Sequence, residues 1–183
     1  MVAERSYEKI TQRDLARLSE LAAADRADRF TRRPRWRVYE SRIIAVALCQ
    51  GAALHYVNGA NGIKDFDVWT FYADHAEGPF PYRWTTRADF GPSRFGRRDS
   101  EPYKETYDGR RVDFIGRSLP EPEGVDAVAA LTRYLSQPQT GSARCLAEKA
   151  IVVIDPRELR GQVLWPEAAY ARLTTAGNSA RSN

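Results

Sequence analysis

The chain has 183 residues, 43% of them hydrophobic and 11% aromatic, which is the composition of a globular protein with a hydrophobic core. Its formal net charge of +4 favours anionic partners such as nucleotides or RNA, although solvated surface charge is the commoner reason for such a balance. Because the only cysteines are Cys49 and Cys145, both in apolar surroundings, and neither a leader nor an apolar run of transmembrane length is present, we expect a soluble protein in the reducing cytoplasm.

The first quarter of the chain predicts a helix followed by a buried strand. Thr11-Gln-Arg-Asp14 has the residue types of a helix start, and apolar residues then recur at helical spacing to about Arg29. Residues 31–37, which include Pro34, indicate a basic break. The run IIAVALC at 43–49 is apolar throughout and β-branched at its start, as in a strand that is buried on both faces.

A glycine turn connects this strand to a second one. Gly51 ends the first strand, and we expect it to adopt the positive φ of a strand-to-helix turn. A short helix over 52–57 and turn residues at 58–62 precede a strand over 64–72. The elements therefore follow the order strand, glycine, helix, turn, strand.

The second strand contains two aspartates at alternate positions. Residues two apart in a strand point the same way, so Asp65 and Asp67 should lie side by side while Phe66 and Val68 face the core. Two like charges so placed repel each other. A divalent metal ion is the commonest way to make such an arrangement favourable.

The rest of the chain predicts one long loop, a third strand and further helices. Residues 73–109 are rich in Gly, Pro, Arg and aromatic residues with little periodicity, which indicates mostly loop, and loops of this length are usually functional or mobile. In the strand expected over 110–119, Asp113 has apolar neighbours, where an unpaired carboxylate would be costly. After it we expect helices over 125–135 and 143–149, a strand or helix extension over 150–155 and a fraying polar tail over 174–183.

These residues together form a characteristic sequence pattern. Residues 53–64 separate Gly51-Ala52 from Asp65, Asp67 follows two positions later, and Asp113 supplies a third carboxylate. Over about residues 40–120 the pattern resembles the nucleotidyltransferase superfamily, which includes DNA polymerase β, the CCA-adding enzymes and antibiotic nucleotidyltransferases. That family has Gly-Gly or Gly-Ser after an apolar strand, so Ala52 is a departure that leaves only backbone N–H groups to contact phosphate.

The resemblance implies an α/β (α+β) domain spanning 1–183, with a small mixed sheet in a core over about 40–155 and an N-terminal helical extension over 8–30. It implies transfer of a nucleoside monophosphate from an NTP such as ATP to a hydroxyl group of RNA, protein or a small molecule. Asp65 and Asp67 would bind two Mg²⁺ or Mn²⁺ ions and the triphosphate, and Asp113 would bind the ion that activates the acceptor. The expected nucleotide-binding positions are Gly51, Ala52, Lys64, Arg83 and Arg111.

Other interpretations of the same residues stay open. Arginines and aromatic residues interleave between 82 and 117, a combination suited to nucleic acid, yet acidic residues in the same stretch would equally give an exposed, ion-paired loop. A calcium loop starting at Asp65 fails because its sixth position is Thr70 rather than glycine. The main alternative is an inactive nucleotidyltransferase-like module that binds nucleotide or RNA for regulation, and metal-dependent turnover distinguishes it from an enzyme.

Overall fold

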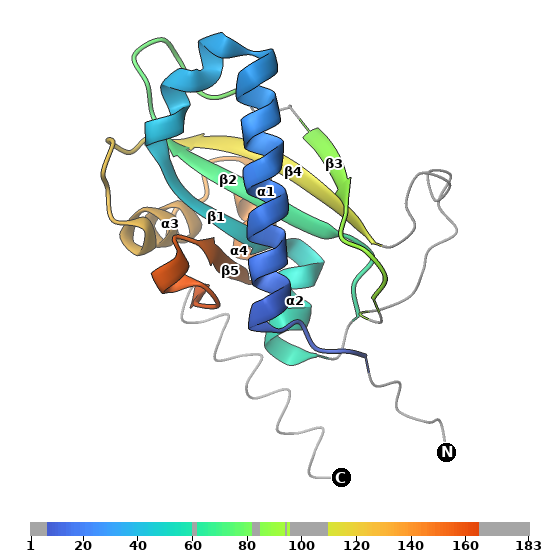
Figure 1. Ribbon diagram of the computed structural model, residues 1–183. Coiled ribbons are helices and arrows are strands. Elements are labelled where there is room, and N and C mark those ends of the chain that lie inside the picture. The colour runs from blue at the N-terminus through green and yellow to red at the C-terminus, as the bar shows by residue number, and fades with distance from the viewer. Residues whose placement is uncertain (1–6, 60–61, 82–84, 94, 96–109, 165–183) are drawn as a thin grey trace, which may run out of the picture.

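A computed structural model describes residues 7–59, 62–81, 85–93, 95 and 110–164, and it has a mixed β-sheet with helices on both faces (Figure 1). The elements in chain order are α1 (Gln12–Arg32), η1 (Pro34–Arg42), β1 (Ile43–Cys49), α2 (Gln50–Asn58), β2 (Phe66–Ala73), β3 (Thr85–Asp89), β4 (Arg111–Leu119), α3 (Ala127–Ser136), α4 (Gly141–Ala147), β5 (Ile151–Asp155), η3 (Arg157–Leu159) and β6 (Val163–Leu164). The predicted α/β class is confirmed.

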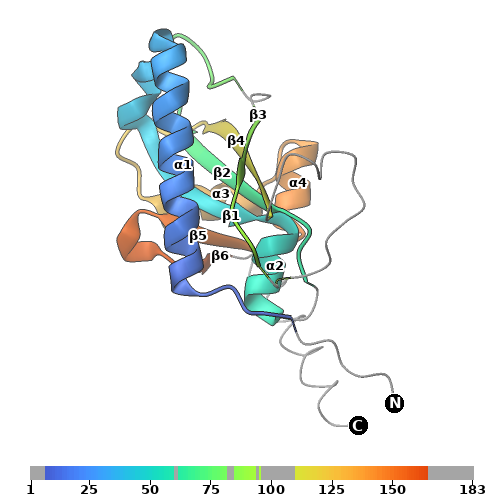
Figure 2. The ribbon, with the colours of Figure 1, turned by 45° about the vertical axis from the view of Figure 1, so that its right-hand side comes forward.

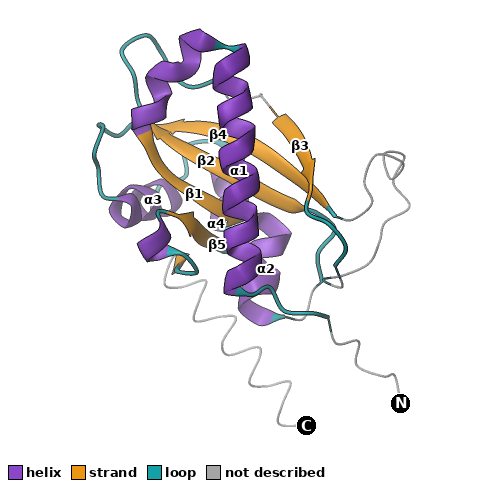
Figure 3. Cartoon of the chain, in the orientation of Figure 1, coloured by secondary structure: helices purple, strands orange, loops and turns teal. Residues whose placement is uncertain are grey.

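The six strands lie in the order β3-β4-β2-β1-β5-β6 (Figure 3). Strands β2 and β4 are parallel, and every other neighbouring pair is antiparallel. A parallel pair needs a long connection, and here the whole segment between β2 and β4, including edge strand β3, provides it. The starts of β2 and β4 therefore lie next to each other at one end of the sheet.

Helix α1 begins at a capping box, as its sequence predicts. The Thr11 hydroxyl accepts a hydrogen bond from the backbone N–H of Asp14, and the Asp14 carboxylate accepts one from the N–H of Thr11. Leu15 and Leu18 are fully buried and pack, together with α2, against one face of the sheet. Helices α3 and α4 cover the opposite face, as the rotated view shows (Figure 2).

Most predicted elements are present, with ends shifted by a few residues. The strand over 43–49 is confirmed as β1, and the choice left open over 150–155 is decided in favour of strand β5. The stretch over 73–109, expected to be mostly loop, contains β3, a five-residue strand that includes arginine and aspartate and pairs with β4. The basic break at 31–37 is instead the end of α1 and the start of η1. The tail over 174–183 lies outside the described residues.

None of the helices in the described part of the chain combines the length and apolar character needed to cross a membrane.

Candidate active site

Asp65, which directly precedes β2, and Asp67 within the strand lie on the face of the sheet that the alternation predicts. Phe66 and Val68 are fully buried in the core under α1, whereas Asp65 and Asp67 lie on the opposite face, at the start of the strand. Strand β1 pairs with β2 so that Cys49 lies opposite Asp67. Since α2 begins at Gln50, the first turn of this helix lies next to Asp67.

Strand β4 brings the third aspartate to the same place. In the parallel β2–β4 pair Asp67 is directly opposite Asp113, and residues paired in this way point to the same face. Asp113 is 9% exposed, while Val112 and Phe114 on either side of it are buried in the core under α1. The three predicted carboxylates are therefore together, and we call Asp65, Asp67 and Asp113 the carboxylate cluster.

Basic side chains surround the carboxylate cluster. Nη2 of Arg111 lies 2.5 Å from Oδ2 of Asp65 and 2.9 Å from Oδ2 of Asp113, so one nitrogen connects β4 to the residue that precedes β2. Arg87 of β3 pairs in register with Asp113, and its Nε lies 3.6 Å from Oδ1 of that residue. Lys149, which follows α4, donates a hydrogen bond from Nζ to Oε1 of Gln50 at 3.1 Å.

The electrostatics of the cluster centre on Asp67. Burial, followed by the charges of Asp65 and Asp113, raises the pKa of Asp67 to about 7, against the opposing effect of Arg111 and Lys149. Burial also raises the pKa of Asp113, with Arg111 as the largest opposing influence. A further cation would relieve this repulsion and favour the ionised carboxylates.

The carboxylate cluster has the chemistry of a site for a hard divalent cation. Carboxylate oxygens on neighbouring strands are ligands that Mg²⁺ and Mn²⁺ accept, and Oδ1 of Asp113 is buried without accepting a hydrogen bond from the described residues. As the side chains stand, no three acidic, His or Cys groups in the described ranges form a ready ligand set, and Arg111 lies between two of the carboxylates. The donor set fits the ion provided that Arg111 moves.

The turn between β1 and α2 differs from the prediction. The positive φ expected at Gly51 is found instead at Gln50, whose φ is 59°. Gly51 is exposed inside the helix, with open space where a side chain would start, so a ligand could approach its backbone. Ala52 is buried in the core, where its methyl group packs under the sheet.

The remaining predicted nucleotide-binding residues have different environments. Lys64 is exposed just before Asp65, and its backbone carbonyl accepts a hydrogen bond from Nη1 of Arg110 at 3.0 Å. Arg111 is engaged with the carboxylates, and Arg83 lies outside the described residues, as does much of the arginine-rich stretch. Within that stretch Arg117 donates to the hydroxyls of Ser142 and Thr140, which gives it a structural role.

Three residues outside the predicted set of site residues are brought to this site by the fold. Gln50 and Lys149 meet across 99 positions of sequence, and Arg87 comes from a strand that was expected to be loop. The signal for Gln50 was its position directly before the glycine of the turn.

Cys145 was expected in apolar surroundings but is exposed, because it lies on the outer side of α4.

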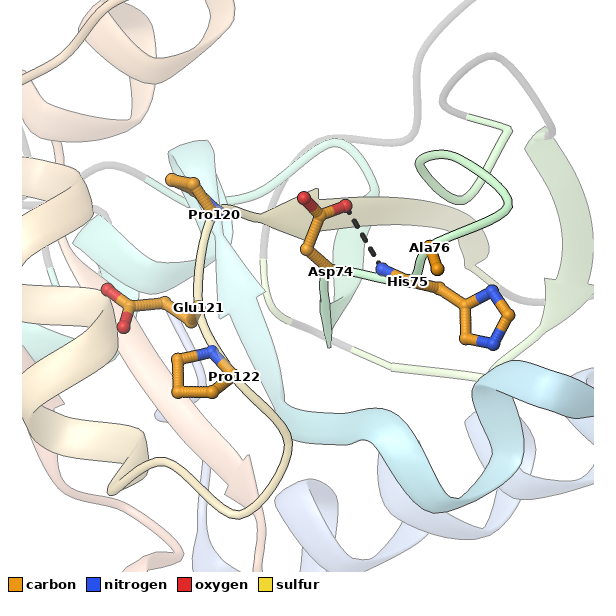
Figure 4. Close-up of a pocket in the computed structure, with 6 residues that line it drawn as sticks. All are labelled: Asp74, His75, Ala76, Pro120, Glu121 and Pro122. Atoms are coloured by element: carbon orange, nitrogen blue, oxygen red, sulfur yellow. Dashed lines mark hydrogen bonds between the residues drawn. The ribbon is translucent and has the colours of Figure 1, made fainter.

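A shallow pocket lies at the other end of β2 and β4 (Figure 4). It has a volume of about 360 Å³ and is lined by Asp74, His75, Ala76, Pro120, Glu121 and Pro122. Within it the Asp74 carboxylate accepts a hydrogen bond from the backbone N–H of His75 at 3.1 Å. At the rise of a β-strand, Asp74 is roughly 20 Å from Asp67, so the pocket is separate from the carboxylate cluster.

Comparison of the chain with protein-family models, curated proteins and solved structures gives no match. The chemistry of the site therefore has to be inferred from its own residues. These are three carboxylates on two parallel strands, with arginine and lysine side chains and the first turn of a helix around them.

Proposed function

We propose that the protein is a metal-dependent nucleotidyltransferase, which transfers a nucleoside monophosphate from an NTP to a hydroxyl acceptor. The observation that carries this proposal is the register of β2 and β4, which sets Asp113 directly beside Asp67 at the end of the sheet where α2 begins. The spacing of the glycine and the three aspartates, which resembles that superfamily, supports the same function.

The three carboxylates have two roles in this proposal. Asp65 and Asp67 would hold Mg²⁺ or Mn²⁺ together with the triphosphate, and Asp113 would hold the ion next to the acceptor. When bound, such ions neutralise the charge of the phosphates and lower the pKa of the acceptor hydroxyl. Asp113, whose pKa is raised by burial, is suited to take the proton of that hydroxyl.

The proposed reaction exchanges one phosphorus–oxygen bond for another. The acceptor oxygen forms a bond to the α-phosphorus of the NTP, and the bond from that phosphorus to the oxygen bridging to the β-phosphate breaks. The acceptor proton passes to Asp113, and pyrophosphate leaves. Around the triphosphate, the exposed backbone at Gly51 and the ammonium group of Lys149 would provide hydrogen-bond donors.

One observation favours the second candidate, a nucleotide-binding module without turnover. Arg111 contacts two of the three carboxylates, and a cation held there by the chain itself competes with catalytic metal ions. A module of this kind would bind NTP near α2 and would need no acceptor.

Transfer of label separates the enzyme from the module. The wild-type protein, incubated with Mg²⁺, α-labelled NTPs and pools of tRNA, cell protein or hydroxylated metabolites, should label one pool and release pyrophosphate. Asp113→Ala should lower transfer by orders of magnitude while NTP affinity falls much less, because the second metal and the proton acceptor are lost but the Asp65–Asp67 pair remains.

The matched control is Asp74→Asn, which changes another aspartate that follows the same strand but lies beside the separate pocket. It should transfer label at the wild-type rate. Binding of NTP without labelling of any pool, or equal labelling by Asp113→Ala and the wild type, would rule out the enzyme and favour the module.

A further inference from the structure

We propose that Arg111 occupies the place of a divalent cation in the nucleotide-free protein. The site therefore binds metal and nucleotide tightly only when both are present. This inference rests on the proposed function, because it concerns metal and NTP binding at the same carboxylates. It adds to that function a dependence of metal affinity on bound nucleotide. The metal alone should bind weakly, and the triphosphate should be what releases the arginine.

Arg111 contacts two of the three carboxylates at once. A single nitrogen, Nη2, contacts Oδ2 of Asp65, the residue before β2, and Oδ2 of Asp113 in β4. The side chain of Arg111 is only 14% exposed, so these contacts are partly shielded from solvent, where charge-assisted hydrogen bonds are strong. An ion bridging the same two oxygens would have to displace this nitrogen.

The rest of the carboxylate cluster contains oxygens that accept no hydrogen bond from the described residues. Asp67 forms no hydrogen bond or ion pair with the described residues, and Oδ1 of Asp113 accepts no hydrogen bond from them. The oxygens of Asp67 are thus available for a metal, while Oδ1 of Asp113 lies 3.6 Å from Nε of Arg87, a half-exposed side chain. The three carboxylates share the nearby charges of Arg111, Arg87 and Lys149. The arginine between the carboxylates is therefore the obstacle to an ion.

Moving Arg111 away from the carboxylates costs free energy. A guanidinium that leaves two carboxylates in a partly buried site needs another anionic partner, because a half-buried arginine without one is unfavourable. A triphosphate provides that partner, and arginine binds phosphate through two parallel hydrogen bonds. Metal ions and NTP should therefore each strengthen the binding of the other by the same factor.

Mn²⁺ binding, measured by calorimetry with and without a non-hydrolysable NTP, tests this coupling. For the wild type, we expect the nucleotide to tighten Mn²⁺ binding by at least about tenfold, within the usual range of coupling between two sites. Arg111→Gln should bind Mn²⁺ alone at least about tenfold more tightly than the wild type, and the nucleotide should then tighten Mn²⁺ binding less than it does in the wild type. Without metal this variant should also melt at a lower temperature, and Mn²⁺ should raise its melting temperature more than that of the wild type.

Arg117→Gln is the matched control, since Arg117 lies on the same face of β4 but donates to hydroxyl groups rather than to the cluster. Its Mn²⁺ binding should equal that of the wild type. If Arg111→Gln does not fold, Arg111→Lys keeps a cation in place and should retain weak Mn²⁺ binding that the nucleotide strengthens.

The outcomes also distinguish this inference from the proposed function. Equal Mn²⁺ affinity of wild type and Arg111→Gln in the absence of nucleotide would overturn the inference while leaving the transferase proposal intact. Coupled binding without transfer of label would support the inference and overturn the transferase. Absence of Mn²⁺ binding in every variant, with or without nucleotide, would overturn both.

Discussion

At Asp67, a carboxylate lies between two others and has no ion-pair partner of its own among the described residues. Burial and the neighbouring charges raise its pKa to about 7, well above the value of about 3.9 for aspartate in an unfolded chain. The folded protein therefore binds a proton that the unfolded chain has lost in the window between these two values. This proton contributes stability below about pH 4 that disappears as the pH rises through about 7.

We predict that the metal-free wild type loses stability relative to Asp67→Asn as the pH rises through this window. The contribution of Asp67 should fall by no more than about 4 kcal/mol, the full effect of a shift of this size. Urea unfolding of both proteins at pH 5 and pH 8 measures the difference, with the asparagine variant the more stable at pH 8. The same free-energy difference at both pH values would show that Asp67 is not the protonated group.

At the scale of elements, the turn from β1 into α2 determines where the first turn of the helix lies beside the cluster. Gln50 has a φ of 59°, in the left-handed region that costs an L-residue free energy, and its side chain accepts a hydrogen bond from Lys149. The residue at this turn therefore combines an unfavourable backbone with a contact near the site, which is a common combination at functional positions.

Two substitutions at Gln50 separate the backbone from the side chain. Gln50→Ala and Gln50→Gly both lose the contact with Lys149, but only glycine adopts the left-handed conformation without steric cost. We predict that the glycine variant is more stable than the alanine variant by about 1 kcal/mol, measured by denaturant unfolding. Equal stabilities, or a more stable alanine variant, would mean that the turn changes conformation in solution.

At the scale of the whole molecule, the two ends of the parallel pair β2–β4 carry different kinds of side chain. One end holds the carboxylate cluster, and further along the strands Tyr72 stacks on Phe80 with ring centroids 4.3 Å apart in a core of aromatic side chains. Gly116 of β4 lies against the ring of Phe80, where an added Cβ would overlap the ring. The aromatic core and the carboxylate cluster thus lie in separate parts of one sheet.

Gly116→Ala should therefore destabilise the fold without changing metal binding. We expect a loss of about 1–3 kcal/mol in the free energy of unfolding, as for other overpacked cores, with unchanged Mn²⁺ affinity of the folded protein. Gly141→Ala is the control, because no heavy atom lies within 4 Å of the added Cβ there. A marked change in Mn²⁺ affinity in Gly116→Ala would indicate that the two ends of the sheet are coupled.

The sequence by itself determined the features that depend on local backbone geometry. The start of α1 at Thr11, the buried strand over 43–49 and the outward direction of Asp65 and Asp67 opposite Phe66 and Val68 all follow from periods that the backbone imposes on neighbouring residues. The grouping of Asp113 with these aspartates was an expectation drawn from family resemblance, and the register of β2 and β4 now accounts for it.

Only the tertiary structure decided which distant side chains meet. The contacts of Arg111 with Asp65 and Asp113, the hydrogen bond from Lys149 to Gln50 and the pairing of β3 with β4 join segments that no local pattern connects. Strand register is set by the packing of whole layers, because a shift of one residue would turn every buried side chain to the other face. For this reason the arginine contacts of the carboxylate cluster could not be predicted from the sequence, although each of the carboxylates could be identified there.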